Sequence, residues 1–232
     1  MTTLIDDSSH EKFNSSSIRL WQLISPTLPI GSFCYSQGME YSVEVGWVTD
    51  EQSASEWILG QLKNNLSMLD VPLFLRLYDA WLVNDIEAVQ YWNDIVLALR
   101  ESSELYQQDC TLGQAMSRLL EGLDAEPPEL DTDKLAFITV FSFACQHWSI
   151  DRLEAVHGLL WSWCENQSAA AIKLVPLGQT SGQRIMSMAI EAITISIEKG
   201  LLCDDEDIGL LAPGLAIASA LHEKQYSRLF RS

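Results

Sequence analysis

Apolar residues recur along this chain with the spacing of an amphipathic helix, and no useful stretch shows the two-residue alternation of a strand. Ile58, Leu62, Leu66 and Leu69, for example, fall on one helical face. The sequence contains no Asn-Gly or Asp-Gly hairpin turn and no fixed-period repeat. The pattern predicts an all-α protein, folded as a single-domain bundle of about eight to ten helices.

Capping residues and turn formers indicate where the first helices begin and end. Thr49 with Gln52 has the spacing of a capping box. Pro72 is suited to the first turn of the next helix, and Asn84 to the cap of the one after it. Gly122 is expected to end a later helix.

The second half of the chain continues the helical pattern. The segment 133–148 is apolar on nearly all sides, which predicts a central helix surrounded by others. Pro176 is expected to break one helix, and a new one should start near Thr180. The last helix is predicted to run from about Pro213 to Leu221.

We expect three parts in the chain. Residues 1–17 are polar, rich in serine and without the apolar core of a secretory signal, so they are interpreted as a flexible N-terminal leader. Residues 18–223 form the helical domain. Residues 224–232 are interpreted as a C-terminal partner-binding tail.

The charge balance excludes several classes of partner. The chain has 32 Asp and Glu against 14 Lys and Arg, a formal net charge of −18, which disfavours nucleic acid because phosphate backbones are repelled. The longest apolar run is too short to span a bilayer, so no membrane association is expected. Five scattered cysteines suit free thiols in a reducing cytoplasm; they are Cys34, Cys110, Cys145, Cys164 and Cys203.

Three stretches lack the acids that dominate elsewhere. Residues 20–39 carry no charge, residues 173–190 carry only Lys173 and Arg184, and residues 224–232 carry cations but no acid. The first stretch includes a loop with Phe33 and Tyr35 that must be covered, either by the core or by a partner. The second is either a structural helix–loop–helix corner or a contact surface.

The last stretch has the composition of a binding segment. Aromatic and arginine side chains are enriched at interface hot spots, whereas solvated tails favour small and acidic residues. We therefore interpret Tyr226, Arg228, Phe230 and Arg231 as parts of a peptide that docks on another surface.

The sequence lacks recognisable catalytic motifs. No phosphate-binding loop is present, since Lys199-Gly200 is followed by Leu201, and Gly178-Gln-Thr-Ser-Gly182 has the wrong spacing for a nucleophile elbow. His157 lies on an apolar stripe, where a buried core histidine is expected rather than a metal ligand. We assign no catalytic residue, no metal site and no cofactor.

The three acid-poor stretches resemble the motifs of the UreF family of urease accessory proteins. The first matches as Leu20-Trp-Gln-Leu-Ile-Ser-Pro-Thr-Leu-Pro-Ile-Gly31, continuing through Tyr35-Ser-Gln-Gly-Met-Glu40 to Gly46-Trp47. The second matches as Leu174-Val-Pro-Leu-Gly-Gln179 with Gly182-Gln-Arg184, and the third as His222-Glu-Lys-Gln-Tyr-Ser-Arg-Leu-Phe-Arg-Ser232. Between 50 and 168 only the helical pattern and the length agree.

The resemblance implies a cytoplasmic, non-catalytic adaptor for nickel insertion into urease. Such a protein forms a homodimer, joins the accessory protein UreD (also called UreH), recruits the GTPase UreG, and acts with them on urease apoprotein. By resemblance, partner contacts are assigned to two elements, the 179–184 corner and the 226–232 tail. The residues are Gln179, Gly182, Gln183, Arg184, Tyr226, Ser227, Arg228, Leu229, Phe230, Arg231 and Ser232.

Two alternatives remain on the sequence. The first is a helical scaffold for another multiprotein complex, which would use the same stretches on different partners. The second is an enzyme of unrecognised type, for which Cys34 is the best nucleophile candidate.

Overall fold

The computed structural model describes residues 15–132, 134–209 and 212–232, and in this part of the chain every regular element is a helix. The all-α prediction is therefore confirmed. Short helical turns η1 (Ser32–Cys34), η2 (Leu62–Leu66, a π-helical turn) and η3 (Asp205–Asp207) join the longer elements. The α-helices in the described ranges are α1 (Ser15–Leu23), α2 (Met39–Glu44), α3 (Glu51–Gln61), α4 (Asp70–Leu82), α5 (Ile86–Ala98), α6 (Ser103–Glu121), α7 (Phe137–His147), α8 (Arg152–Leu174), α9 (Gln179–Leu201) and α10 (Pro213–His222).

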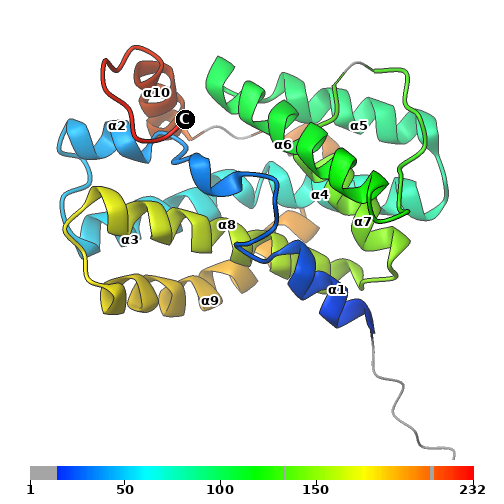
Figure 1. Cartoon of the computed structure of the whole chain (residues 1–232), viewed down its shortest axis with the longest axis horizontal. Coiled ribbons are helices and arrows are strands. Elements are labelled where there is room, and N and C mark those ends of the chain that lie inside the picture. Colours follow the sequence, from blue (N-terminus) through cyan, green and yellow to red (C-terminus); the bar gives the residue numbers. More distant parts are fainter. Residues whose placement is uncertain (1–14, 133, 210–211) are drawn as a thin grey trace, which may run out of the picture.

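The helices pack around α4, which contacts α5, α7, α8 and α9 (Figure 1). The two longest helices, α8 and α9, lie side by side along the lower part of the view. At the centre, Phe74 of α4 and Phe141 of α7 are fully buried, with ring centroids 6.0 Å apart. α2 and α10 pack together at the upper left.

Two predicted caps are wrong by one residue. The capping box of α3 uses Asp50 and Ser53: the Asp50 carboxylate accepts from the Ser53 amide at 2.8 Å, and the Ser53 hydroxyl accepts from the Asp50 amide at 3.1 Å. α5 is capped by Asp85, not Asn84. Polar residues stand side by side at both starts, and a carboxylate is the better match for the positive end of a helix.

Other boundaries agree with the sequence or differ for a visible reason. Gly122 ends α6 as predicted. α4 begins two residues before Pro72, at Asp70. α7 begins only at Phe137, four residues after the predicted start. The amide of Ala136 donates to Asn93 and that of Phe137 to Asp109, so neither amide bonds to an earlier turn of helix.

The predicted leader overlaps the first helix. α1 begins at Ser15, and Ser16 is buried, so residues 15–17 belong to the helical body. The rest of the predicted leader, residues 1–14, lies outside the described residues. Among the described residues, no helix combines the length and apolar character needed to cross a bilayer.

Candidate functional site

The C-terminal segment folds back onto the body of the chain. After α10 it turns and runs beside α2 and η1, at the upper left of Figure 1. The Arg231 amide donates to the Cys34 carbonyl at 2.8 Å, while the Ser232 carbonyl accepts from the amides of Ser36 and Gln37 at 2.5 and 2.9 Å. The Ser36 hydroxyl adds a third hydrogen bond to the same carbonyl. We call the surface that holds residues 228–232 the tail dock.

Glu40, in α2, is the main anchor of the tail dock. Its two carboxylate oxygens accept from the amides of Leu229 at 2.6 Å and Phe230 at 2.8 Å. Glu40 is 8 % exposed, so these charge-assisted hydrogen bonds are shielded from water. A carboxylate that holds two consecutive amides fixes the main chain of the tail at Leu229 and Phe230.

A buried histidine joins the anchor to α6. His222 is fully buried, with Nε2 3.2 Å from the Glu40 carboxylate and Nδ1 2.7 Å from the Glu104 carboxylate. Arg228 donates to the other Glu104 oxygen at 2.6 Å. The expectation that His157 is the core histidine is wrong: His157 is exposed, and its ring bonds the Leu153 carbonyl of its own helix.

Close packing of α2 against α10 brings the residues of this network together. Gly38, which precedes α2, has φ +76°, and a Cβ there would lie 3.0 Å from the Ser219 amide nitrogen. Any other residue would be strained by the backbone conformation and would push α10 away.

The tail is only half available to a partner. Phe230 and Ser232 are buried against the chain itself, with the Phe230 ring under the Lys173 ammonium at 5.6 Å. The side chains that face solvent belong to Tyr226, Ser227, Arg228, Leu229 and Arg231. Tyr226 is completely exposed and Leu229 is 67 % exposed.

The three acid-poor stretches meet at the tail dock. The first supplies Ser36 and Gln37, the second supplies Lys173, and the third is the tail itself. In the N-terminal loop, the core covers some apolar side chains and leaves others exposed. Tyr35 is buried in the core, whereas Phe33 is 57 % exposed. Leu28 and Ile30, like Tyr35, are buried in the core.

The 179–184 corner has a structural part and an exposed part. Gly182 is buried where α9 crosses α8, and a Cβ there would lie 2.5 Å from Ile172 Cδ1, so its role is close packing. Gln179, Gln183 and Arg184 are exposed.

Arg184 forms a bidentate ion pair with a carboxylate of another helix. Its Nε and Nη2 atoms donate to the two oxygens of Glu51, at the start of α3, at 2.6 and 2.5 Å. These hydrogen bonds from Arg184 lower the pKa of Glu51 from 4.5 to about 2. The corner lies at the lower left of Figure 1, at the same end of the molecule as the tail.

Sequence reasoning missed the acids that build the tail dock. Glu40 and Glu104 lie outside the expected contact elements, and one charged residue among 32 acids carries no local signal of burial. The available signal was the motif itself, since one quoted motif ends on Glu40 and another begins at His222.

The candidate nucleophile and ligands are not gathered into a catalytic cluster. Cys34 is partly buried and supplies its main-chain carbonyl to the tail. In the described ranges, no three His, Cys, Asp or Glu side chains are arranged to share a metal ion.

Comparison with known proteins decides the family. The UreF family model matches residues 48–189, more than half of the chain. The chain belongs to the UreF family. It is 47% identical over 216 residues to "Urease accessory protein UreF" of Alkalilimnicola ehrlichii. The aligned region covers 92% of this chain and 95% of that protein. The UreF proteins of Chromohalobacter salexigens and Psychrobacter cryohalolentis are 44% and 41% identical, over 92% and 98% of this chain and 93% and 99% of theirs.

The UreF assignment confirms the resemblance derived from the three motifs. The family model ends at residue 189, before the tail.

Proposed function

We propose that this chain is a non-catalytic adaptor in urease maturation, which binds UreD (UreH), recruits the GTPase UreG, and acts with them on urease apoprotein during nickel insertion. Its relatives are named urease accessory proteins, and that name supports a role of this chain in urease maturation. In this proposal nickel is cargo of the assembly, and the chain works in the cytoplasm as a homodimer without a cofactor of its own.

The observation that carries the proposal is the ordered tail with outward-facing hot-spot residues. Tyr226, Arg228, Leu229 and Arg231 project from a main chain that Glu40 holds in place. Interfaces concentrate binding energy in aromatic and arginine side chains, and a peptide that is ordered before binding loses less conformational entropy. We infer that the exposed half of the tail is a partner-contact element.

The exposed corner residues form a second proposed contact. Gln179, Gln183 and Arg184 lie at the same end of the molecule as the tail. The Arg184–Glu51 pair remains accessible to a partner, because its two side chains are 56 % and 32 % exposed. We assign Gly182, Phe230 and Ser232 a supporting role, because they pack against the chain itself.

The test is capture of UreD and UreG from cells that express the urease operon, with the tail changed in two ways. A Tyr226→Ala/Arg231→Ala variant removes only exposed side chains, so its thermal melting should match the unchanged protein. Its capture of UreD should fall about tenfold or more, as for loss of interface hot spots. A chain that ends at Lys224 should lose both capture and urease activation.

The matched control is Tyr91→Ala, which removes an exposed tyrosine from α5, outside the proposed contact elements. It should capture partners normally. Full assembly and urease activation by the chain ending at Lys224 would show that the tail is not a contact element. Failure of the unchanged protein to capture either UreD or UreG would contradict the adaptor function.

A further inference from the structure

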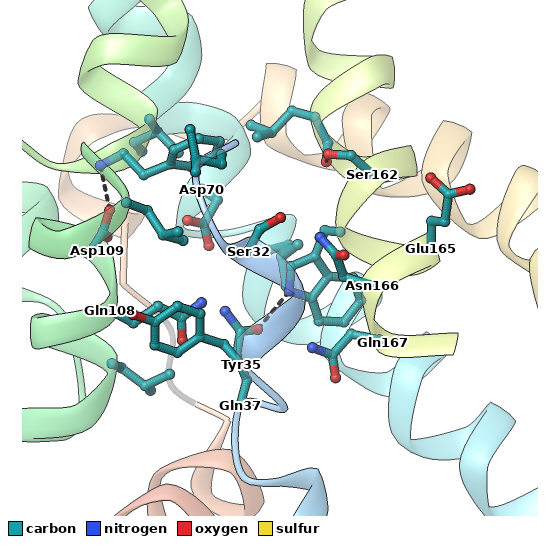
Figure 2. Close-up of a pocket in the computed structure, with 18 of the residues that line it drawn as sticks. Ser32, Tyr35, Gln37, Asp70, Gln108, Asp109, Ser162, Glu165, Asn166 and Gln167 are labelled. Atoms are coloured by element: carbon teal, nitrogen blue, oxygen red, sulfur yellow. Dashed lines mark hydrogen bonds between the residues drawn. The ribbon is translucent and has the colours of Figure 1, made fainter. Parts of the chain in front are cut away.

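A cavity of about 130 Å³ lies between the N-terminal loop and helices α4, α6 and α8. Figure 2 shows Gln108 and Asp109 of α6 on one side of it and Glu165, Asn166 and Gln167 of α8 on the other. Leucine and isoleucine side chains contribute apolar surface to the wall, and polar and charged side chains line much of the rest. A cavity of this size is comparable to one that binds benzene in an engineered protein core, so it is large enough for a small organic group.

The Gln167 side chain in the wall has an oxygen atom without a hydrogen-bond partner in the described structure. Gln167 is 2 % exposed and lines the cavity, and its Oε1 atom is shielded from solvent without a hydrogen bond in the described structure. A buried amide without a hydrogen bond is costly, and an amide can turn to present either its donor or its acceptor. Gln167 therefore points to an occupant that forms hydrogen bonds.

The charges around the cavity favour a cationic occupant. Glu101 and Glu165 both line it, and in the described structure neither forms an ion pair. Burial raises the pKa of both carboxyl groups. The cation in the wall, Arg100, is already held by two aspartates, at 2.8 Å from Asp70 and 2.5 Å from Asp109.

We propose that this cavity is a binding site for a small organic cation, an alkylguanidinium or alkylammonium group. The leucine and isoleucine side chains of its mixed wall suit an aliphatic stem, Glu101 and Glu165 supply the opposing charge, and the Gln167 amide can form a hydrogen bond. A metal ion is a poorer fit, because the described residues offer no group of three ligating side chains.

The tail dock fixes one wall of the cavity. Gln108 accepts from the Ser232 hydroxyl at 2.9 Å, and Gln37, whose amide holds the Ser232 carbonyl, accepts from Trp163 Nε1 at 2.7 Å (Figure 2). The tail is thus hydrogen-bonded to two residues of the cavity wall, Gln37 and Gln108. The test therefore needs the full chain.

The experiment is a calorimetric titration of the full chain with butylguanidinium, and with 1-pentanol and pentanoate as neutral and anionic compounds of similar size. We expect saturable binding of the cation at one site, about tenfold or more weaker binding of the alcohol, and none of the anion. Glu101→Gln and Gln167→Leu should each weaken binding of the cation about tenfold.

Both variants are chosen to keep the fold. Gln167→Leu conserves volume and removes a buried amide whose oxygen has no partner, while Glu101→Gln removes a partly buried charge. The matched control is Glu191→Gln, an exposed carboxylate on α9, which should bind like the unchanged protein. No saturable heat, equal affinity in all four proteins, or preference for the alcohol would overturn the proposal and leave water as the occupant.

Native mass spectrometry of the chain purified from cells identifies the source of the cation. A bound mass that is lost in Gln167→Leu indicates a free small molecule. If no mass is bound and butylguanidinium instead weakens capture of UreD, the cation is a Lys or Arg side chain of that partner. This second source rests on the proposed adaptor function, whereas the titration tests the site without it.

Discussion

Arg184 shows how a residue expected to contact a partner can also hold its own chain together. Its guanidinium spans both oxygens of Glu51, but both side chains remain partly exposed, at 56 % and 32 %. An exposed ion pair adds little to stability, because water and salt screen it. The pair therefore orients Arg184 at the corner more than it stabilises the fold. The oriented guanidinium remains accessible to a binding partner.

The pKa of Glu51 reports this orientation directly. In Arg184→Gln the hydrogen bonds from the guanidinium are lost, so the pKa of Glu51 should rise from about 2 toward its ordinary value of 4.5. The folded-state pKa is below the unfolded one, so the contribution of the pair to stability is present above about pH 4.5 and is lost as the pH falls toward 2. A carboxyl-detected NMR titration measures the shift, and an unchanged Glu51 pKa in the variant would contradict the pairing.

Helices α8 and α9 show what close packing requires at the scale of elements. They pack along their lengths, and Gly182 is placed where Ile172 of α8 leaves no room for a Cβ. Helix periodicity predicted both helices, but it could not distinguish a packing glycine from a functional one. That distinction needs the neighbouring helix.

Gly182→Ala should destabilise the protein by roughly 1–3 kcal/mol, because the added methyl group overlaps Ile172. The cost should be smaller in an Ile172→Ala background, where the space is free, so the two changes should be non-additive. Urea unfolding of the two single variants and the double variant measures this coupling.

Gly60→Ala is the matched control for the glycine change. Gly60 lies in α3, and a Cβ there meets no atom within 4 Å. Alanine should leave stability unchanged or raise it by about 1 kcal/mol through helix propensity. Equal destabilisation at both glycines, or additive effects of Gly182→Ala and Ile172→Ala, would rule out the steric account.

At the scale of the whole molecule, the tail dock joins segments from opposite ends of the sequence. Glu40 and Leu229 are 189 residues apart in the chain and share a hydrogen bond. Phe230 belongs to the main core cluster, so the tail is part of the folded body. Because the proposed contact residues sit on this segment, their arrangement depends on the integrity of the dock.

Glu40→Gln should loosen the tail and destabilise the protein by roughly 2–4 kcal/mol, because one acceptor oxygen becomes a donor that faces a buried amide. Hydrogen exchange should accelerate at the amides of Leu229 and Phe230, and urea unfolding gives the free-energy change. Glu44→Gln, an exposed carboxylate at the end of the same helix, should alter neither quantity. Unchanged exchange at both amides in Glu40→Gln would show that Glu40 does not anchor the tail.

Local sequence determined the helices, the positions of their boundaries to within a few residues, and the family. Apolar periodicity and capping chemistry act between residues three or four apart, so α3, α6, α8 and α9 could be read directly from their own segments. The motifs around Glu40, Arg184 and His222 were likewise visible without coordinates.

Only the tertiary structure decided what those residues do. Phe230 lies in a segment with the composition of an exposed contact, but its side chain is buried. His222, and not His157, is the core histidine, and Glu40 anchors the tail. Each role depends on which segment lies opposite, and that partner is more than a hundred residues away for Glu40 and His222. A local pattern reports the apolar face of each helix, whereas the packing of the whole chain selects which carboxylate meets which amide.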